Sequence, residues 1–180
     1  MIFLSLGSNL SSLDGKINRF KNIDNAIKAI LSKGYVLIKK SNYYETPSYP
    51  NNNNPKFINV VISLKEKNSI SIKEDLIKEL MGTIFQIESS FGRQRKKKND
   101  PRTIDIDIID YDKKTLEMKL FNSEMIKIPH ERLSLRNFVL FPLKEICPNW
   151  IHPVTRKSID ELIDGLSEIN KKSILKVEHS

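Results

Sequence analysis

Residues 103–111 read Thr-Ile-Asp-Ile-Asp-Ile-Ile-Asp-Tyr, and this stretch decides the fold prediction. Apolar and polar residues alternate along its first part, which is the period of a β-strand with one face in a core. The alternation places three isoleucines on one face and Thr103, Asp105 and Asp107 on the other. We therefore expect a strand that packs on a core with one face and offers two carboxylates on the other.

Working outward from this strand, the chain supplies its partners in a recognisable order. Expected strands and helices follow from runs of β-branched residues and from helical spacing of apolar groups: strands at 2–6, 35–45 and 57–64, and helices at 14–32 and 71–90. The order βαββαβ predicts an α+β fold, with a ferredoxin-like core of mainly antiparallel sheet and helices packed on it.

The C-terminal third adds to this core, and we expect one domain over residues 1–180. The additions are a short hairpin within 113–128, a helical or turn-rich packing segment at 136–146, a short helix at 158–166, and a loose tail after about residue 170.

Composition excludes several classes of protein. The 180 residues are 39% hydrophobic and 29% charged, and no apolar run reaches the roughly 18–20 residues of a membrane span. The start, MIFLSLGSNL, lacks the basic leader and cleavage site of a signal peptide. Cys147 is the single cysteine, so neither an internal disulfide nor a cysteine zinc site is possible, and a cytoplasmic location is expected.

The positive charge is concentrated in one segment. Residues 93–102 carry six basic side chains and one acid, which is +5 of the net +8. Such a balance favours an anionic partner: nucleic acid, a membrane surface or a phosphate-rich small molecule. The lysines there are typical of a solvated loop, but Arg93, Arg95 and Arg102 can grip phosphate in a fork.

Asp105 and Asp107 form the most informative pair. On one strand face their backbones lie about 6–7 Å apart, so their oxygens can converge on cations. The pair could also be a solvated strand face, since two acids there need no ligand. Beside Arg102 and the basic segment, the pair predicts a divalent metal site, because magnesium prefers one or two carboxylates together with substrate phosphates.

Other candidates are less specific. His130 could donate to a phosphate, although a lone histidine is more often structural, and Phe57 and Phe138 could be ordinary core residues. The sequence has neither a P-loop motif nor GxGxxG, so an ATP site must be built from separate side chains. Two alternatives stay open: an RNA-binding module on a ferredoxin-like sheet, and a metal-dependent phosphoryl or nucleotidyl transferase with another acceptor.

Several of these segments together resemble a known family, 6-hydroxymethyl-7,8-dihydropterin pyrophosphokinase. The resemblance spans residues 1 to about 165 and is carried by these motifs: Leu6-Gly7-Ser8-Asn9-Leu10, Tyr44-Glu45-Thr46-Pro47, Phe57-Ile58-Asn59, Phe91-Gly92-Arg93-Gln94-Arg95, Pro101 to Asp107, Pro129-His130 and Arg136-Asn137-Phe138. The family's tryptophan in the basic loop has no counterpart, since the sole tryptophan is Trp150.

The resemblance implies an activity and a role for each site residue. The implied reaction is pyrophosphoryl transfer from ATP to the hydroxymethyl group of the dihydropterin, releasing AMP, in folate biosynthesis. Asp105 and Asp107 would hold two magnesium ions and, with Arg93, Arg95 and Arg102, act in catalysis. The resemblance assigns ATP binding to Glu88, Arg93, Arg95, Arg102, Ile108, His130 and Arg136, and pterin binding to Thr46, Pro47, Tyr49, Phe57, Asn59 and Phe138.

In this assignment the two phenyl rings would stack on the faces of the flat pterin, and Asn59 would read its polar edge. The implied partners are ATP and the dihydropterin, with neither nucleic acid nor membrane. We expect a monomer, acting alone or as one unit of a longer folate-pathway polypeptide.

Overall fold

The computed structural model describes residues 1–12, 14–49, 53–66, 73–92, 100–119 and 125–179. Its strands are β1 (Ile2–Ser8), β2 (Tyr35–Lys40), β3 (Tyr43–Thr46), β4 (Phe57–Glu66), β5 (Asp105–Tyr111), β6 (Leu116–Lys119), β7 (Met125–Ile128) and β8 (Leu175–Val177). Its helices are α1 (Arg19–Ser32), α2 (Lys73–Ser90), the 3-10 turn η1 (Leu133–Leu135), α3 (Asn137–Ile146), α4 (Ile159–Asp164) and α5 (Glu168–Lys172).

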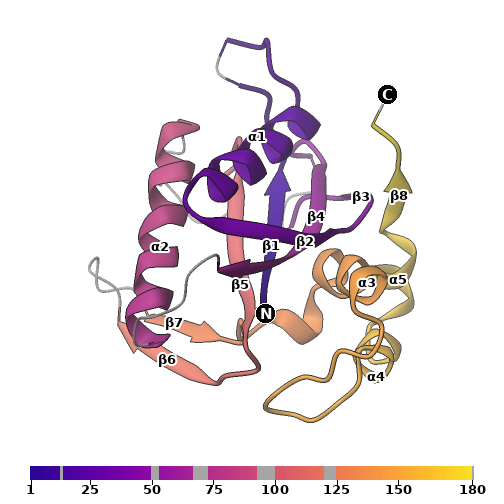
Figure 1. Cartoon of the computed structure of the whole chain (residues 1–180). Helices are drawn as coiled ribbons and strands as arrows, with labels where there is room; N and C mark the ends of the chain where they lie inside the picture. Colours follow the sequence, from indigo (N-terminus) through magenta and orange to yellow (C-terminus); the bar gives the residue numbers. More distant parts are fainter. Residues whose placement is uncertain (13, 50–52, 67–72, 93–99, 120–124, 180) are drawn as a thin grey trace.

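The described strands form a six-stranded sheet and a separate hairpin of β6 and β7 (Figure 1). In the large sheet the order is β5-β1-β4-β3-β8, and β2 pairs with the other half of β4. All of these pairs are antiparallel. The arrangement confirms the predicted α+β fold with a mainly antiparallel sheet, and it places β5 at one edge, beside the interior strand β1.

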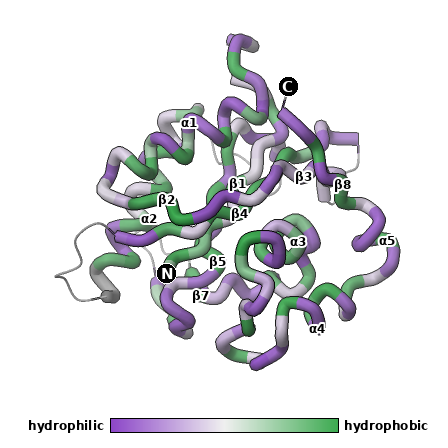
Figure 2. Tube along the Cα trace, turned by 45° about the vertical axis from the view of Figure 1, so that its right-hand side comes forward, coloured by the Kyte–Doolittle hydropathy of each residue, from purple (hydrophilic) through white to green (hydrophobic). Residues whose placement is uncertain are grey.

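Helices cover both faces of this sheet. Helices α1 and α2 pack on one face, over the alternate aliphatic residues of β1, β4 and β5, and together they form the first core. Helices α3 and α4 pack on the opposite face, against Phe3, Val61 and Ile109, and form the second core. Figure 2 shows α3 between the sheet and α4. Because both faces of β4 are covered, residues 58–64 are all buried, including the polar Asn59 and Ser63.

Helix α1 and the expected strand 35–45 differ most clearly from the sequence prediction. Helix α1 begins at Arg19 rather than at residue 14, because the Asn18 side chain accepts a hydrogen bond from the Lys21 N–H and caps the helix there. The expected strand 35–45 is divided into β2 and β3. At the break, the Ser41 hydroxyl accepts a hydrogen bond from the Val61 N–H.

The C-terminal segment is more ordered than its polar composition predicts, so the expected loose tail is wrong for the described residues. Strand β8 extends the sheet by pairing with β3. The Asn137 amide donates to the Asn170 carbonyl oxygen at 2.6 Å and to the Ser173 hydroxyl at 3.0 Å. The His179 ring lies 4.9 Å from that of Phe20. An edge strand and a buried amide thus satisfy backbone groups that composition alone leaves to water.

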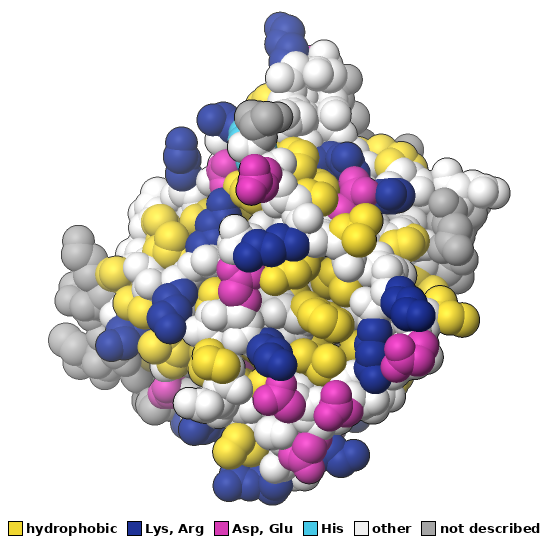
Figure 3. All heavy atoms as spheres, turned by 90° about the vertical axis from the view of Figure 1, so that its right-hand side faces the viewer, with side chains coloured by type: hydrophobic (Ala, Val, Ile, Leu, Met, Phe, Trp, Pro, Cys, Tyr) yellow, Lys and Arg dark blue, Asp and Glu magenta, His cyan; other side chains and the backbone are white. Residues whose placement is uncertain are grey.

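The surface that holds β8 and α5 carries both signs of charge. Figure 3 shows basic and acidic side chains interspersed there, with apolar side chains between them. Such a mixed pattern differs from the basic stripe that a nucleic-acid backbone requires. In the described part of the chain, none of the helices has the length and apolar character needed to cross a bilayer.

Candidate active site

Strand β5 brings two carboxylates to one face of the sheet. The side chains of Asp105 and Asp107 are 28% and 31% exposed, whereas the isoleucines between and beside them are buried. In the strand register, Asp105 lies opposite Gly7 of β1, and Asp107 lies opposite Ser5. Two small residues of β1 therefore lie beside the two acids.

Each of these acids has an arginine within ion-pair distance. An Nη1 atom of Arg102 lies 3.2 Å from Asp105, and the corresponding atom of Arg136 lies 2.6 Å from Asp107. Arg136 comes from the segment just before α3, so the tertiary fold, and not local sequence, places it at β5. Its guanidinium carbon also lies 5.5 Å from the centre of the Phe138 ring.

The carboxylate pair fits magnesium by its donor chemistry. Magnesium takes one or two carboxylates and fills its remaining positions with water and substrate phosphates. Within the described residues, no group of three or more His, Cys, Asp or Glu side chains could form an all-protein cage. Two half-exposed carboxylates with arginines beside them are suited to a cation that arrives with a polyphosphate.

His130 lies on the edge of this charged group. Its Nδ1 atom accepts a hydrogen bond from the Arg132 N–H at 3.1 Å, so in the neutral ring the proton is on Nε2. Burial lowers the pKa of His130, although the nearby Asp107 acts in the opposite direction. The residue is therefore a neutral donor through Nε2–H at physiological pH, which suits a hydrogen bond to phosphate.

A row of residues crosses the sheet from the acids toward β3. Asp105, Gly7 and Asn59 are paired in register on β5, β1 and β4. Asn59 is 3% exposed, and its amide donates to the Thr46 hydroxyl at 3.0 Å and to the Tyr44 carbonyl at 3.3 Å. Across two strand spacings, the amide and the acid lie about 10 Å apart at the backbone.

The predicted aromatic residues border the same face. The Phe57 ring lies over Gly7, and Phe138 stands at the start of α3, partly buried against the second core. Pro47 and Tyr49 follow β3 and are exposed, Tyr49 at 83%. The structure thus brings together one buried amide, one buried hydroxyl and aromatic rings from two elements, beside the carboxylate pair.

Gly7 is required by the close approach of its neighbours. A Cβ atom at this position would lie 3.2 Å from the Asn59 Oδ1 atom and 3.4 Å from a Phe57 ring carbon. We expect Gly7→Ala to displace both side chains and to weaken, on the order of tenfold, binding of the pterin that the sequence resemblance implies, since small misplacements of binding groups are costly. Calorimetric titration with the pterin and, separately, with ATP measures the effect, and ATP affinity is expected to change little.

The matched control is Gly82→Ala in the middle of α2, where nothing lies within 4 Å of an added Cβ. It should stabilise the helix by about 0.5–1 kcal/mol and leave pterin binding unchanged. Equal pterin affinities of the Gly7→Ala variant and the wild type would exclude the steric argument.

Asn9 connects the two halves of the site and was not among the predicted site residues. Its Oδ1 atom accepts from the Arg102 N–H at 2.7 Å, and its amide donates to the Pro55 carbonyl at 3.1 Å and the Ser48 hydroxyl at 3.3 Å. The residue joins the segment before β5 to the segment between β3 and β4. The sequence signal for Asn9 is the motif Gly7-Ser8-Asn9, but the motif alone does not indicate what the asparagine does.

Four other predicted ATP-site residues lie away from the face that carries Asp105 and Asp107, or outside the described residues. Glu88 is buried at the end of α2, and its Oε1 atom accepts from the Ile106 N–H at 2.9 Å. The Ile108 side chain belongs to the first core. Arg93 and Arg95 lie outside the described residues. The structure therefore links Glu88 to the position of β5.

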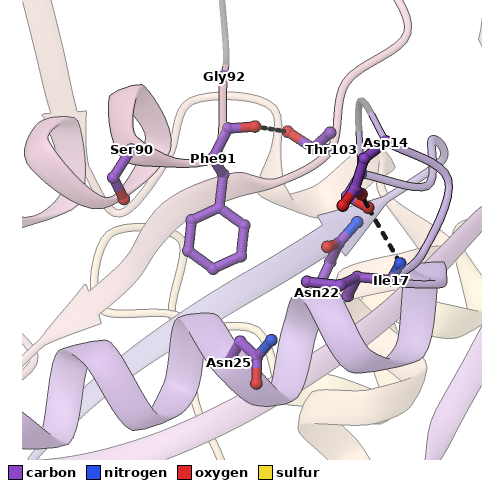
Figure 4. Close-up of a pocket in the computed structure, with 9 residues that line it drawn as sticks. Asp14, Ile17, Asn22, Asn25, Ser90, Phe91, Gly92 and Thr103 are labelled. Atoms are coloured by element: carbon purple, nitrogen blue, oxygen red, sulfur yellow. Dashed lines mark hydrogen bonds between the residues drawn. The ribbon is translucent and has the colours of Figure 1, made fainter.

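Thr103 does not share the face of the two acids, because β5 begins only at Asp105. Its hydroxyl donates to the Phe91 carbonyl at 2.6 Å, and it lines a separate cavity of about 390 Å³ (Figure 4). Figure 4 shows the Phe91 ring facing α1 from the end of α2. The polar residues of this cavity include Asp14 and Asn22, but none of the predicted site residues.

Comparison with known proteins adds a family match. The family model of 7,8-dihydro-6-hydroxymethylpterin-pyrophosphokinase matches residues 3–148. The chain is 36% identical over 160 residues to 2-amino-4-hydroxy-6-hydroxymethyldihydropteridine pyrophosphokinase of Aquifex aeolicus, covering 89% of the chain and 88% of that protein. The Synechocystis protein of the same name is 32% identical over 162 residues, 89% of the chain and 73% of its own length.

A longer relative also matches. The "Folic acid synthesis protein fol1" of Pneumocystis carinii is 36% identical over 174 residues, which are 97% of the chain. The chain spans only 21% of that protein's length, whereas it spans most of the bacterial relatives.

Proposed function

Because the chain belongs to the 7,8-dihydro-6-hydroxymethylpterin-pyrophosphokinase family, we propose that the face around Asp105 and Asn59 carries the family's reaction. That reaction is transfer of a pyrophosphoryl group from ATP to hydroxymethyldihydropterin in folate biosynthesis, so the chain is a transferase. The observation that supports the placement most is the row of Asp105, Gly7 and Asn59 in register across the sheet. It puts Asp105, which we assign to the phosphates, and Asn59, which we assign to the polar edge of the pterin, on one face.

Our proposal for the pterin starts from its flat, hydrogen-bonding ring. Phe57 and Phe138 would contact the two faces of the ring, and Asn59 with Thr46 would bind its polar edge, with backbone groups near Pro47 and Tyr49. The Asn59 amide already donates to the Thr46 hydroxyl, which fixes its orientation before a ligand arrives. A pre-oriented amide discriminates against analogues that leave its oxygen unpaired.

The ATP side follows from the charged residues. Asp105 and Asp107 would hold magnesium, while Arg102 and Arg136, with Arg93 and Arg95, would bind phosphate oxygens. His130 would donate from Nε2 to a phosphate, as its Nδ1 is already engaged. Magnesium, when bound, supplies neutralisation of phosphate charge and a lower pKa for the attacking hydroxyl.

The chemical step is a substitution at the β-phosphorus of ATP. The hydroxymethyl oxygen forms a bond to that phosphorus, the bridge from the α-phosphate breaks, and AMP leaves with the bridging oxygen. The hydroxyl proton passes to water. Positioning and electrostatic stabilisation supply most of the acceleration in such transfers, so the arginines and the carboxylates are the groups that matter.

Product analysis tests this proposal. The purified protein is mixed with ATP, magnesium and 6-hydroxymethyl-7,8-dihydropterin, and the products are followed by phosphorus NMR. We expect AMP and a pterin diphosphate in equal amounts, and neither when the pterin is omitted. Formation of ADP would instead favour a phosphoryl transferase with another acceptor, and formation of free pyrophosphate would favour a nucleotidyl transferase.

The RNA-binding alternative lacks structural support in the described residues. It requires exposed aromatic side chains on central strands, but all seven residues of β1 are buried, and Phe57 of β4 is only partly exposed. The cytoplasmic location and the monomeric state stay predictions. The 36% identity to one part of the longer fol1 protein supports the proposal that this type of unit also works within a folate-pathway polypeptide.

A further inference from the structure

Each of the two acids that we assign to magnesium is already engaged by an arginine. The Arg136–Asp107 contact is 2.6 Å and the Arg102–Asp105 contact is 3.2 Å, and both arginine side chains are less than a fifth exposed. These are the carboxylate oxygens that a cation would need. Within the described residues each acid is thus paired with one arginine, so a cation has to compete with a guanidinium for these oxygens.

Both arginines are held in place by further contacts. The Arg102 Nε atom donates to the Asp100 carbonyl at 3.0 Å, and its backbone N–H donates to the Asn9 side chain at 2.7 Å. The Arg136 guanidinium lies beside the Phe138 ring as well as Asp107. The two ion pairs are therefore parts of an organised site, unlike pairs between mobile surface side chains.

This pairing affects a free cation and a nucleotide-bound cation differently. A free divalent cation must displace a guanidinium and leave it without a counter-charge in a half-buried site, which is unfavourable. A cation that arrives on a polyphosphate brings new anionic partners for the arginines, so the charges remain balanced.

We propose that Arg136 and Arg102 act as counter-ions that prevent the acid pair from binding free divalent cations. The pair then binds such a cation only together with a polyphosphate. This inference rests on the proposed function, since it takes Asp105 and Asp107 as the metal-binding acids. It goes further by giving the arginines a role before any phosphate is bound, namely to occupy the carboxylate oxygens.

Manganese binding without nucleotide tests the inference. The electron paramagnetic resonance signal of free Mn²⁺ falls when the ion binds to the protein, so the signal measures the affinity. We expect the wild type to bind Mn²⁺ weakly and Arg136→Met to bind it about tenfold or more tightly, since one nearby charge shifts carboxylate cation affinity by such factors. Methionine keeps much of the apolar stem of the arginine. Arg102→Met supplies a second variant that acts through Asp105.

Arg132→Met is the matched control, because Arg132 is an exposed arginine four positions earlier. It removes an exposed positive charge, which solvent screens, and leaves both arginine–carboxylate pairs in place, so its Mn²⁺ affinity should be close to that of the wild type. The double variant Arg136→Met, Asp107→Asn should lose the gain. The thermal midpoint of every variant is measured to establish that it is folded.

The outcomes separate the two proposals. Unchanged Mn²⁺ affinity in both Arg136→Met and Arg102→Met, or an equal gain in Arg132→Met, shows that the two arginines do not prevent free cations from binding. If Mn²⁺-ATP binding to the wild type still depends on Asp107 in that case, the proposed metal site stands. If Mn²⁺-ATP binding is insensitive to Asp107→Asn, the metal site itself is wrong.

Discussion

Asp107→Ala is expected to lower turnover on the order of 10³-fold while the protein stays folded, because it removes one of two carboxylates that we assign to the metal. The side chain is 31% exposed and lies outside both cores, so its loss leaves no apolar cavity. Its partner Arg136 would lose an ion pair, which costs about 1–3 kcal/mol where the charge is partly buried. Steady-state kinetics at varied magnesium concentration measures the effect, with circular dichroism as the test of folding.

Two comparison variants make this result specific. Asp107→Asn keeps the shape of the side chain and removes the charge, so it should be nearly as inactive as the alanine variant. Asp160→Ala removes an exposed acid of α4 that pairs with Lys144, and it should remain fully active. Wild-type turnover in Asp107→Ala, with an unchanged magnesium requirement, would show that Asp107 holds no metal.

The sequence predicted the central part of the fold because its signals are local. The alternation around Ile106 has the period of a strand, and the run Ile58–Leu64 has the length and β-branched content of one. The order of strands and helices then leaves few antiparallel topologies. Local signals did not show that α3 and α4 cover the second face, since residues 136–146 alone do not reveal the surface on which they pack.

The candidate site was predictable where one strand holds the chemistry. Asp105 and Asp107 share a face for reasons that two-residue periodicity gives directly. The contact of Arg136 with Asp107 joins residues 29 positions apart, and no pattern of spacing predicts it. Thr103 shows the opposite error, because the alternation was extended two residues beyond the start of β5.

Glu88 and Asn9 show how buried polar residues escape sequence reasoning. The buried carboxylate of Glu88 accepts from the Ile106 N–H, and Asn9 accepts from the Arg102 N–H. Both side chains satisfy backbone donors beside the acids, which fixes the start of β5. Their partners are chosen by the tertiary fold, so the sequence motifs marked their positions without indicating this role.

Phe138→Ala is expected to weaken pterin binding far more than ATP binding. Removing one aromatic ring from a stack on a flat heterocycle costs about 1–3 kcal/mol, or about 5- to 150-fold in Kd. Phe138 lies at the start of α3, and its ring contacts the Arg136 guanidinium on the phosphate side. Loss of that cation–π contact is worth about 0.5–1 kcal/mol, so a smaller effect on ATP is expected.

Calorimetry with the pterin, in the presence of a nonhydrolysable ATP analogue and magnesium, measures the first effect, and titration with the analogue alone measures the second. Phe141→Leu is the matched control, because Phe141 is on the same helix and packs against the second core. It should lower the thermal midpoint and leave pterin affinity unchanged. Equal losses of pterin and ATP affinity in Phe138→Ala would mean that the ring supports the start of α3 as a whole. A pterin-selective loss requires the ring to contact the ligand, because a general loosening of α3 would move Arg136, and with it the phosphate side, to the same extent.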